Sequence, residues 1–145
     1  MMVHLIAVIL TAMTLQHPSP PAVKRLAEPE EMRCLAENIY HEARGESDAG
    51  QMAVALTTLS RVRSHIWPDT ICGVVYQDRQ FSWTMRDVSV REPEAWLKSQ
   101  IVARQALVSK KPWAATFFHA ISVNPEWSDG YTLVATIGNH KFYRF

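Results

Sequence analysis

Two acidic side chains stand close together in the run Glu42-Ala43-Arg44-Gly45-Glu46. A carboxyl group that is partly removed from water holds its proton at higher pH and can serve as a general acid. Two carboxyl groups ~5–5.5 Å apart can share the work of breaking a glycosidic bond, one as the acid and one as the nucleophile. Glu42 is therefore the candidate catalytic acid, and Glu46 is a candidate secondary acid.

The apolar residues around Glu42 recur with helical spacing, as Met32, Leu35, Ala36, Ile39, Tyr40 and Ala43. At ~100° per residue, Glu42 lies about 80° from the centre of this stripe, at the margin of the buried face. A carboxyl group in that position can be partly desolvated. From position alone, a surface glutamate paired with Arg44 or Arg61 is the alternative, and Glu46 is equally compatible with a helix-flanking acid.

Other catalytic patterns find less support. His41 precedes Glu42, but the zinc-protease signature His-Glu-x-x-His fails because Gly45 occupies its fifth position. A metal on His41, His119 and His140 would require three distant histidines to converge, so we expect no metal and no cofactor. The serine-nucleophile pattern Gly-x-Ser-x-Gly is absent.

Two tryptophans, Trp83 and Trp127, stand in polar, turn-rich stretches where an indole can stack on a sugar ring. Hydrogen bonds to such a ligand are expected from Gln80, Ser82, His119, Asn124 and His140. Each of these residues, taken singly, is also compatible with a structural role.

The helices that must position these side chains occupy the first part of the chain. The first is predicted to follow Glu28 and to end before Gly45. The second should begin at a capping box formed by Asp48 and Gln51 and run to about Arg63. A short helix over 71–75, capped by Asp69 or Thr70, and a long helix from Glu92-Pro93 to about Ser109 should follow.

The last third of the sequence changes to a period of two. Alternation predicts strands over 117–123, 131–137 and 140–145, with Gly138-Asn139 as a two-residue hairpin connection. Helices followed by a small antiparallel sheet define an α+β domain.

The chain has 145 residues, and its 15 Lys and Arg nearly balance its 14 Asp and Glu, for a formal net charge of +1. That balance argues against a broad basic surface, so we expect no nucleic-acid partner. Residues 1–15 carry no formally charged side chain and precede the Pro-rich stretch 18–21. We expect 1–27 to be an export or anchor segment with a linker, through which residues 1–15 can associate with a membrane; a loose tail is the alternative. Residues 28–145 are expected to form one domain.

Several ordered blocks resemble the cell-wall hydrolase family typified by the spore cortex-lytic enzyme SleB. The blocks are 34–46, 50–55, 61–62, 68–77, Gln80-Phe81-Ser82, Phe118-His119, 123–125 with Trp127, and 137–144. The resemblance implies a lysozyme-like helical lobe with a small sheet, and it assigns the catalytic glutamate of Glu-Ala-Arg-Gly-Glu to Glu42. The shared blocks add Phe81 and Tyr143 to the expected substrate-binding residues.

This resemblance implies a lytic transglycosylase that cleaves the bond between N-acetylmuramic acid and N-acetylglucosamine in peptidoglycan glycan strands and leaves 1,6-anhydro ends. A hydrolytic muramidase, a zinc-dependent amidase or peptidase, and a non-catalytic glycan-binding module are the alternatives. We expect a monomer that acts in the periplasm or cell envelope, as a phage endolysin or a wall-remodelling enzyme. In an exported domain Cys34 and Cys72 can form a disulfide; two buried free thiols are the alternative.

Overall fold

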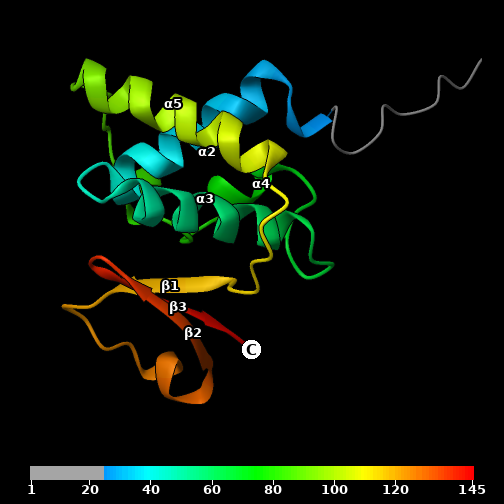
Figure 1. The fold of residues 1–145 in the computed structure, drawn as a ribbon, viewed down its shortest axis with the longest axis vertical. Coiled ribbons are helices and arrows are strands. Elements are labelled where there is room, and N and C mark those ends of the chain that lie inside the picture. The colour runs from blue at the N-terminus through cyan, green and yellow to red at the C-terminus, as the bar shows by residue number, and fades with distance from the viewer. Residues whose placement is uncertain (1–24) are drawn as a thin grey trace, which may run out of the picture.

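The computed structural model describes residues 25–145, which form a layer of helices followed by a small sheet (Figure 1). The helices are α2 (Pro29–Ala43), α3 (Asp48–Val62), α4 (Ile71–Val75) and α5 (Pro93–Val108), with the 3-10 helices η1 (Ser82–Met85) and η2 (Glu126–Gly130). The strands are β1 (Phe117–Ala120), β2 (Thr132–Ile137) and β3 (His140–Arg144). The predicted α+β class is confirmed.

The predicted export or anchor segment and its Pro-rich stretch lie outside the described residues. Within 25–145, no helix is both long and apolar enough to cross a bilayer.

Local sequence explains where the helices begin. Pro93 stands in the first turn of α5, where its missing N–H costs no helical hydrogen bond. The Thr70 hydroxyl caps α4 by accepting a hydrogen bond from the Gly73 backbone N–H. The prediction for α3 was wrong by one residue, because Ser47 has the extended backbone of a cap and accepts from Gly50, whereas Asp48 is already helical.

The main core lies among the four α-helices. Leu35, Ile39 and Leu59 are fully buried between α2 and α3, and Val102 joins them from α5. A disulfide between Cys34 and Cys72 links α2 to α4, with the two Cα atoms 5.2 Å apart. The helices thus form a fixed platform under the last turn of α2.

The sheet has the strand order β1-β3-β2, and both pairings are antiparallel. The predicted turn at Gly138-Asn139 connects β2 to β3, and Gly138 has a left-handed φ of 55° there. The first strand is shorter than predicted, because β3 begins at His140, opposite Ala120, and offers no partner beyond that point. Ile121 to Val123 therefore leave the sheet, although the Ile121 N–H still reaches the Asn139 carbonyl.

The two faces of the sheet have different neighbours. Phe118 and Phe142 are paired across β1 and β3 and pack toward the helices. The neighbouring pair, Phe117 and Tyr143, faces the opposite way, because successive strand residues alternate between faces. Figure 1 shows the sheet as a separate layer beside the helices. Arg61 of α3 also reaches Phe117, with its guanidinium 5.7 Å from the ring centroid.

Candidate active site

Glu42 lies in the last turn of α2, on the wall of a pocket between the helices and the sheet. The pocket has a volume of about 320 Å³. It is lined by Glu42, Arg61, Arg79, Gln80, Phe81, Ser82, Met85 and Phe118. Among residues 25–145, Glu42 is the only carboxyl group in this lining.

Burial raises the pKa of Glu42 from its ordinary value of 4.5 to about 7, and the nearby Arg61 guanidinium opposes this rise. Desolvation is the larger effect because the charged form loses water that the pocket does not replace. A carboxyl group with a pKa near 7 is protonated often enough at neutral pH to donate a proton and can take one back afterwards.

Arg61 comes from the last turn of α3 and is buried beside Glu42. Its Nε donates to the Thr116 carbonyl at 2.6 Å, and its Nη1 donates to Gln80 Oε1 at 2.9 Å. The guanidinium also lies over the ring of Phe81, 5.6 Å from the ring centroid. Burial lowers the pKa of Arg61 to about 10, which still leaves it charged at neutral pH.

These contacts fix a positive charge next to the acid. From the sequence, Arg61 was considered as a surface partner for Glu42 and as part of the block 61–62, but its place in the pocket wall was not predicted. One feature of the sequence could have indicated it: Arg61 stands four positions after Thr57, on the face of the helix that is otherwise buried. The other predicted partner, Arg44, instead pairs with Glu92 at 2.8 Å.

Three predicted substrate-binding residues do line the Glu42 pocket, namely Gln80, Phe81 and Ser82. Gln80 and Ser82 are exposed and can reach a ligand, whereas Phe81 is buried and contributes an apolar floor. They follow a tight turn in which Arg79 has a left-handed φ of 59°. Arg79, Met85 and Phe118 were not predicted as lining residues.

Trp83 is not available as a sugar-stacking surface. Its side chain is only 9% exposed, and its indole stacks on the His41 imidazole with the ring centroids 4.4 Å apart. The short helix η1 turns the neighbouring Ser82 outward and the indole inward. We therefore place Trp83 in the core and leave it out of the substrate-binding set.

Another group of predicted residues gathers on the outer face of the sheet. His119 hydrogen-bonds the Tyr143 hydroxyl through Nε2 at 3.1 Å and stacks on the same ring. Trp127 packs edge-on against both of these rings. Asn124 is exposed in the loop before η2. None of these four residues lines the Glu42 pocket.

Glu46 and His140 lie at the hairpin end of the sheet, apart from the pocket lining. Glu46 accepts hydrogen bonds from Asn139, and His140 is buried on the inner face of β3. Burial lowers the pKa of His140, an effect partly opposed by the Glu46 carboxylate. Neither side chain lines the pocket of Glu42.

The three histidines considered as metal ligands have different surroundings. His41 stacks on Trp83, His119 lies on the outer face of the sheet, and His140 lies on the inner face. No group of three or more His, Cys, Asp or Glu side chains within 25–145 has an arrangement that could hold a metal ion.

A helical platform that supports a small sheet, with one desolvated carboxyl group in the pocket between them, defines a small α+β domain with a candidate active site. Residues 45–143 match the family model described as Cell Wall Hydrolase. The chain belongs to this family. The matched region begins three residues after Glu42, so Glu42 itself lies outside the match.

Relatives and solved structures agree with this assignment. The chain is 30% identical over 118 residues to the spore cortex-lytic enzyme of Oceanobacillus iheyensis and 28% identical over 118 residues to that of Bacillus subtilis. These alignments cover 77% of this chain but only 41% and 37% of the two relatives, so the chain spans about two fifths of their length.

The fold is similar to two solved catalytic domains. The catalytic domain of the Bacillus cereus SleB protein superposes with a TM-score of 0.66 at 25% identity, covering 78% of this chain and 88% of that one. The catalytic domain of the germination-specific lytic transglycosylase SleB from Bacillus anthracis gives the same score and identity, covering 93% of that chain.

Proposed function

We propose that this protein is a peptidoglycan lytic transglycosylase in which Glu42 is the only catalytic acid and base. The observation that carries the proposal is the Glu42 carboxyl group, with its pKa raised to about 7 inside a pocket lined by hydrogen-bonding side chains. Membership of the Cell Wall Hydrolase family and the similarity to a lytic transglycosylase domain supply the substrate class.

In the proposed reaction, protonated Glu42 donates its proton to the oxygen that links C1 of N-acetylmuramic acid to N-acetylglucosamine. The C1–O bond breaks, and positive charge develops at C1. The C6 hydroxyl of the same muramic acid attacks C1, and the Glu42 carboxylate accepts the proton of that hydroxyl. One C–O bond breaks, one forms, and the proton returns to Glu42, leaving a 1,6-anhydro end.

The pocket provides what this sequence of steps needs. The Arg61 charge stabilises the Glu42 carboxylate that exists between the two proton transfers, and Thr116 and Gln80 hold Arg61 in place. Gln80 and Ser82 can donate and accept hydrogen bonds to sugar hydroxyl and acetamido groups. Because the C6 hydroxyl of the muramic acid is the nucleophile, no second carboxyl group is required to activate water.

The proposed substrate also sets the place of action. Peptidoglycan lies outside the cytoplasmic membrane, so we propose that the enzyme works in the periplasm or cell envelope, in wall remodelling or in phage lysis. We propose glycan strands as its partner and a monomer as its working form.

Product analysis tests the chemistry. Purified peptidoglycan digested with the full chain should release fragments whose anhydro-muramic acid ends are about 20 mass units lighter than hydrolytic ends reduced with sodium borohydride, because the anhydro ring lacks one water molecule and does not take up hydrogen from borohydride. Reducible, hydrated ends would replace the transglycosylase proposal with a muramidase, and wall binding without soluble fragments would indicate a glycan-binding module.

A further inference from the structure

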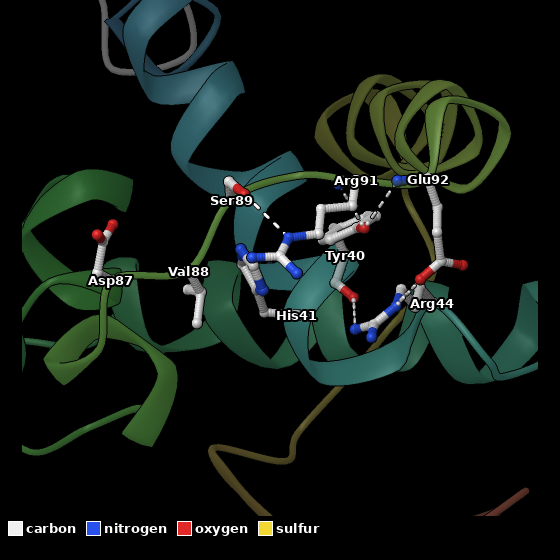
Figure 2. Close-up of a pocket in the computed structure, with 8 residues that line it drawn as sticks. All are labelled: Tyr40, His41, Arg44, Asp87, Val88, Ser89, Arg91 and Glu92. Carbon is white, nitrogen blue, oxygen red and sulfur yellow. Dashed lines mark hydrogen bonds and ion pairs between the residues drawn. The ribbon is translucent and has the colours of Figure 1, made fainter.

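A second pocket lies beside the Glu42 pocket, across the last turn of α2, and Figure 2 shows the side chains around it. It has a volume of about 290 Å³ and is formed by α2 and the loop that joins η1 to α5. The lining residues that matter here are Tyr40, His41, Arg44, Asp87, Arg91 and Glu92. The proposed cleavage reaction uses none of them.

The wall of this pocket is held in place by a buried hydroxyl group. Tyr40 is 2% exposed, and its Oη accepts hydrogen bonds from the backbone N–H groups of Arg91 and Glu92 at 3.1 and 3.2 Å. Figure 2 shows both bonds converging on the tyrosine from the loop. A pocket whose loop is fixed in this way needs little reorganisation to bind a ligand.

The charges in the pocket are only partly paired. Arg44 and Glu92 form an ion pair at 2.8 Å and so balance each other. Within residues 25–145, Arg91 has no carboxylate partner; its Nε donates to Ser89 Oγ at 3.3 Å, and its remaining N–H groups are free to bind a ligand. Asp87 likewise has no cationic partner among the described residues. The pocket therefore presents one guanidinium and one carboxylate to a ligand.

The two pockets are lined by residues that are neighbours in the sequence. His41 lines it while the next residue, Glu42, lines the first pocket, and consecutive Cα atoms are ~3.8 Å apart. On the opposite wall, Met85 lines the first pocket and Asp87 lines the second. With the bond to be cleaved at Glu42, a substituent that leaves the sugar close to that bond is near enough to reach the second pocket.

We propose that this pocket binds the peptide stem carried by muramic acid, with Arg91 pairing with a stem carboxylate and Asp87 with a stem ammonium group. The stem is attached through the lactyl group at C3, close to the cleaved bond at C1, and it carries both charges when it ends in an uncross-linked diamino acid. This inference rests on the proposed function and extends it from the glycan to the peptide.

Kinetics on two matched substrates test the proposal. One substrate is soluble, uncross-linked glycan strands bearing tripeptide stems that end in meso-diaminopimelate, and the other is the same strands after an amidase has removed the stems. Arg91→Ala should raise KM about tenfold on the stem-bearing strands, which is the effect expected for a lost charge-assisted hydrogen bond, and leave KM on bare strands unchanged. Arg86→Ala is the matched control, because Arg86 is exposed in the same loop and lines neither pocket.

Equal increases in KM on both substrates, or no increase on either, would overturn the stem proposal while leaving the cleavage reaction intact. Failure of the unmodified chain to cleave either substrate would instead overturn the proposed function. A binding measurement tests the peptide pocket separately from glycan cleavage. N-acetylated L-Ala-γ-D-Glu-meso-diaminopimelate should shift the amide NMR signals of residues 87–92 in the full chain but not in Arg91→Ala. An absence of shifts in the full chain would refute peptide binding whatever the activity.

Discussion

Glu46 accepts two hydrogen bonds from Asn139, one from the backbone N–H to Oε2 at 3.1 Å and one from Nδ2 to Oε1 at 3.0 Å. Glu46 lies in the connection between α2 and α3, and Asn139 lies at the tip of the β2–β3 hairpin. A Cβ atom at Gly138, the residue before Asn139, would collide with the same Glu46 carboxylate. The helices and the sheet are thus joined at this point by a carboxylate that is fully engaged.

Because Glu46 is engaged in this contact, we predict that Glu46→Ala lowers stability more than activity. The loss of two exposed hydrogen bonds should cost about 1 kcal/mol and lower the Tm by a few degrees, with kcat kept within about threefold. Thermal unfolding and peptidoglycan digestion measure the two effects, with the exposed Glu126→Ala as the control. A folded Glu46→Ala chain that lacks activity would restore Glu46 as a second catalytic acid.

Glu42→Gln should remove the proton donor while keeping the size and polarity of the side chain. We expect kcat to fall by about 10²–10⁴-fold, the range for loss of general acid–base catalysis, with the fold unchanged. Release of soluble fragments from purified peptidoglycan gives the rate, and circular dichroism checks the fold. Activity near that of the unmodified chain would remove Glu42 from the mechanism.

The raised pKa of Glu42 also predicts how stability depends on pH. Between pH 4.5 and about 7 the folded chain keeps a proton on Glu42 that the unfolded chain releases, so this group makes the free energy of unfolding fall as pH rises through that window. At pH 8 the free energy of unfolding of Glu42→Gln should therefore exceed that of the unmodified chain by on the order of 2 kcal/mol. Near pH 4 this difference should disappear. Urea unfolding at the two pH values measures the difference, and an equal offset at both would contradict it.

Arg61 should act through Glu42, as a positioning residue with a charge. Arg61→Met removes the positive charge that lowers the pKa of Glu42, so the alkaline limb of the activity profile should move to higher pH. Arg61→Lys keeps a positive charge and should move the alkaline limb less. Both variants lose the guanidinium group that donates hydrogen bonds to Thr116 and Gln80. A purely structural role would lower activity in both variants without moving the limb.

The Cys34–Cys72 bridge encloses a separation of 38 residues, and chain-entropy estimates assign a loop of that size about 4 kcal/mol of stability. The double variant Cys34→Ser with Cys72→Ser should therefore unfold at a clearly lower urea concentration. The same shift should follow when a reductant is added to the unmodified chain, and the double variant should not respond to it. Identical midpoints for the oxidised and reduced chain would contradict the estimate.

Periodicity in the sequence was sufficient to predict the helices and the hairpin, because those elements depend on local spacing and on residues such as Pro93, Thr70 and Gly138. The end of β1 depends on a partner instead. Alternation continues through Ile121 and Val123, but β3 starts opposite Ala120 and leaves nothing for them to pair with. The length of β1 is thus set by where β3 begins, and the residue pattern of β1 alone carries no information about that position.

The site was predictable only where its residues are close in sequence or share a motif. Gln80 and Ser82 stand together in one turn and both line the Glu42 pocket, while their contacts with a ligand stay a prediction. The polar surroundings of Trp83 suggested exposure, yet a tight turn directs the indole into the core. His119 is likewise adjacent to the pocket-lining Phe118, but strand alternation sends it to the opposite face.

His41 and Glu42 are consecutive residues of α2 that line different pockets, which limits how the sequence of this helix can change. Each residue turns ~100° around the helix axis, so inserting or deleting a single residue in α2 would rotate the acid out of its pocket and another side chain into it. The geometry of both pockets therefore depends on the register of one helix. A substitution can change the lining of either pocket alone, whereas an insertion or deletion in α2 changes the lining of both.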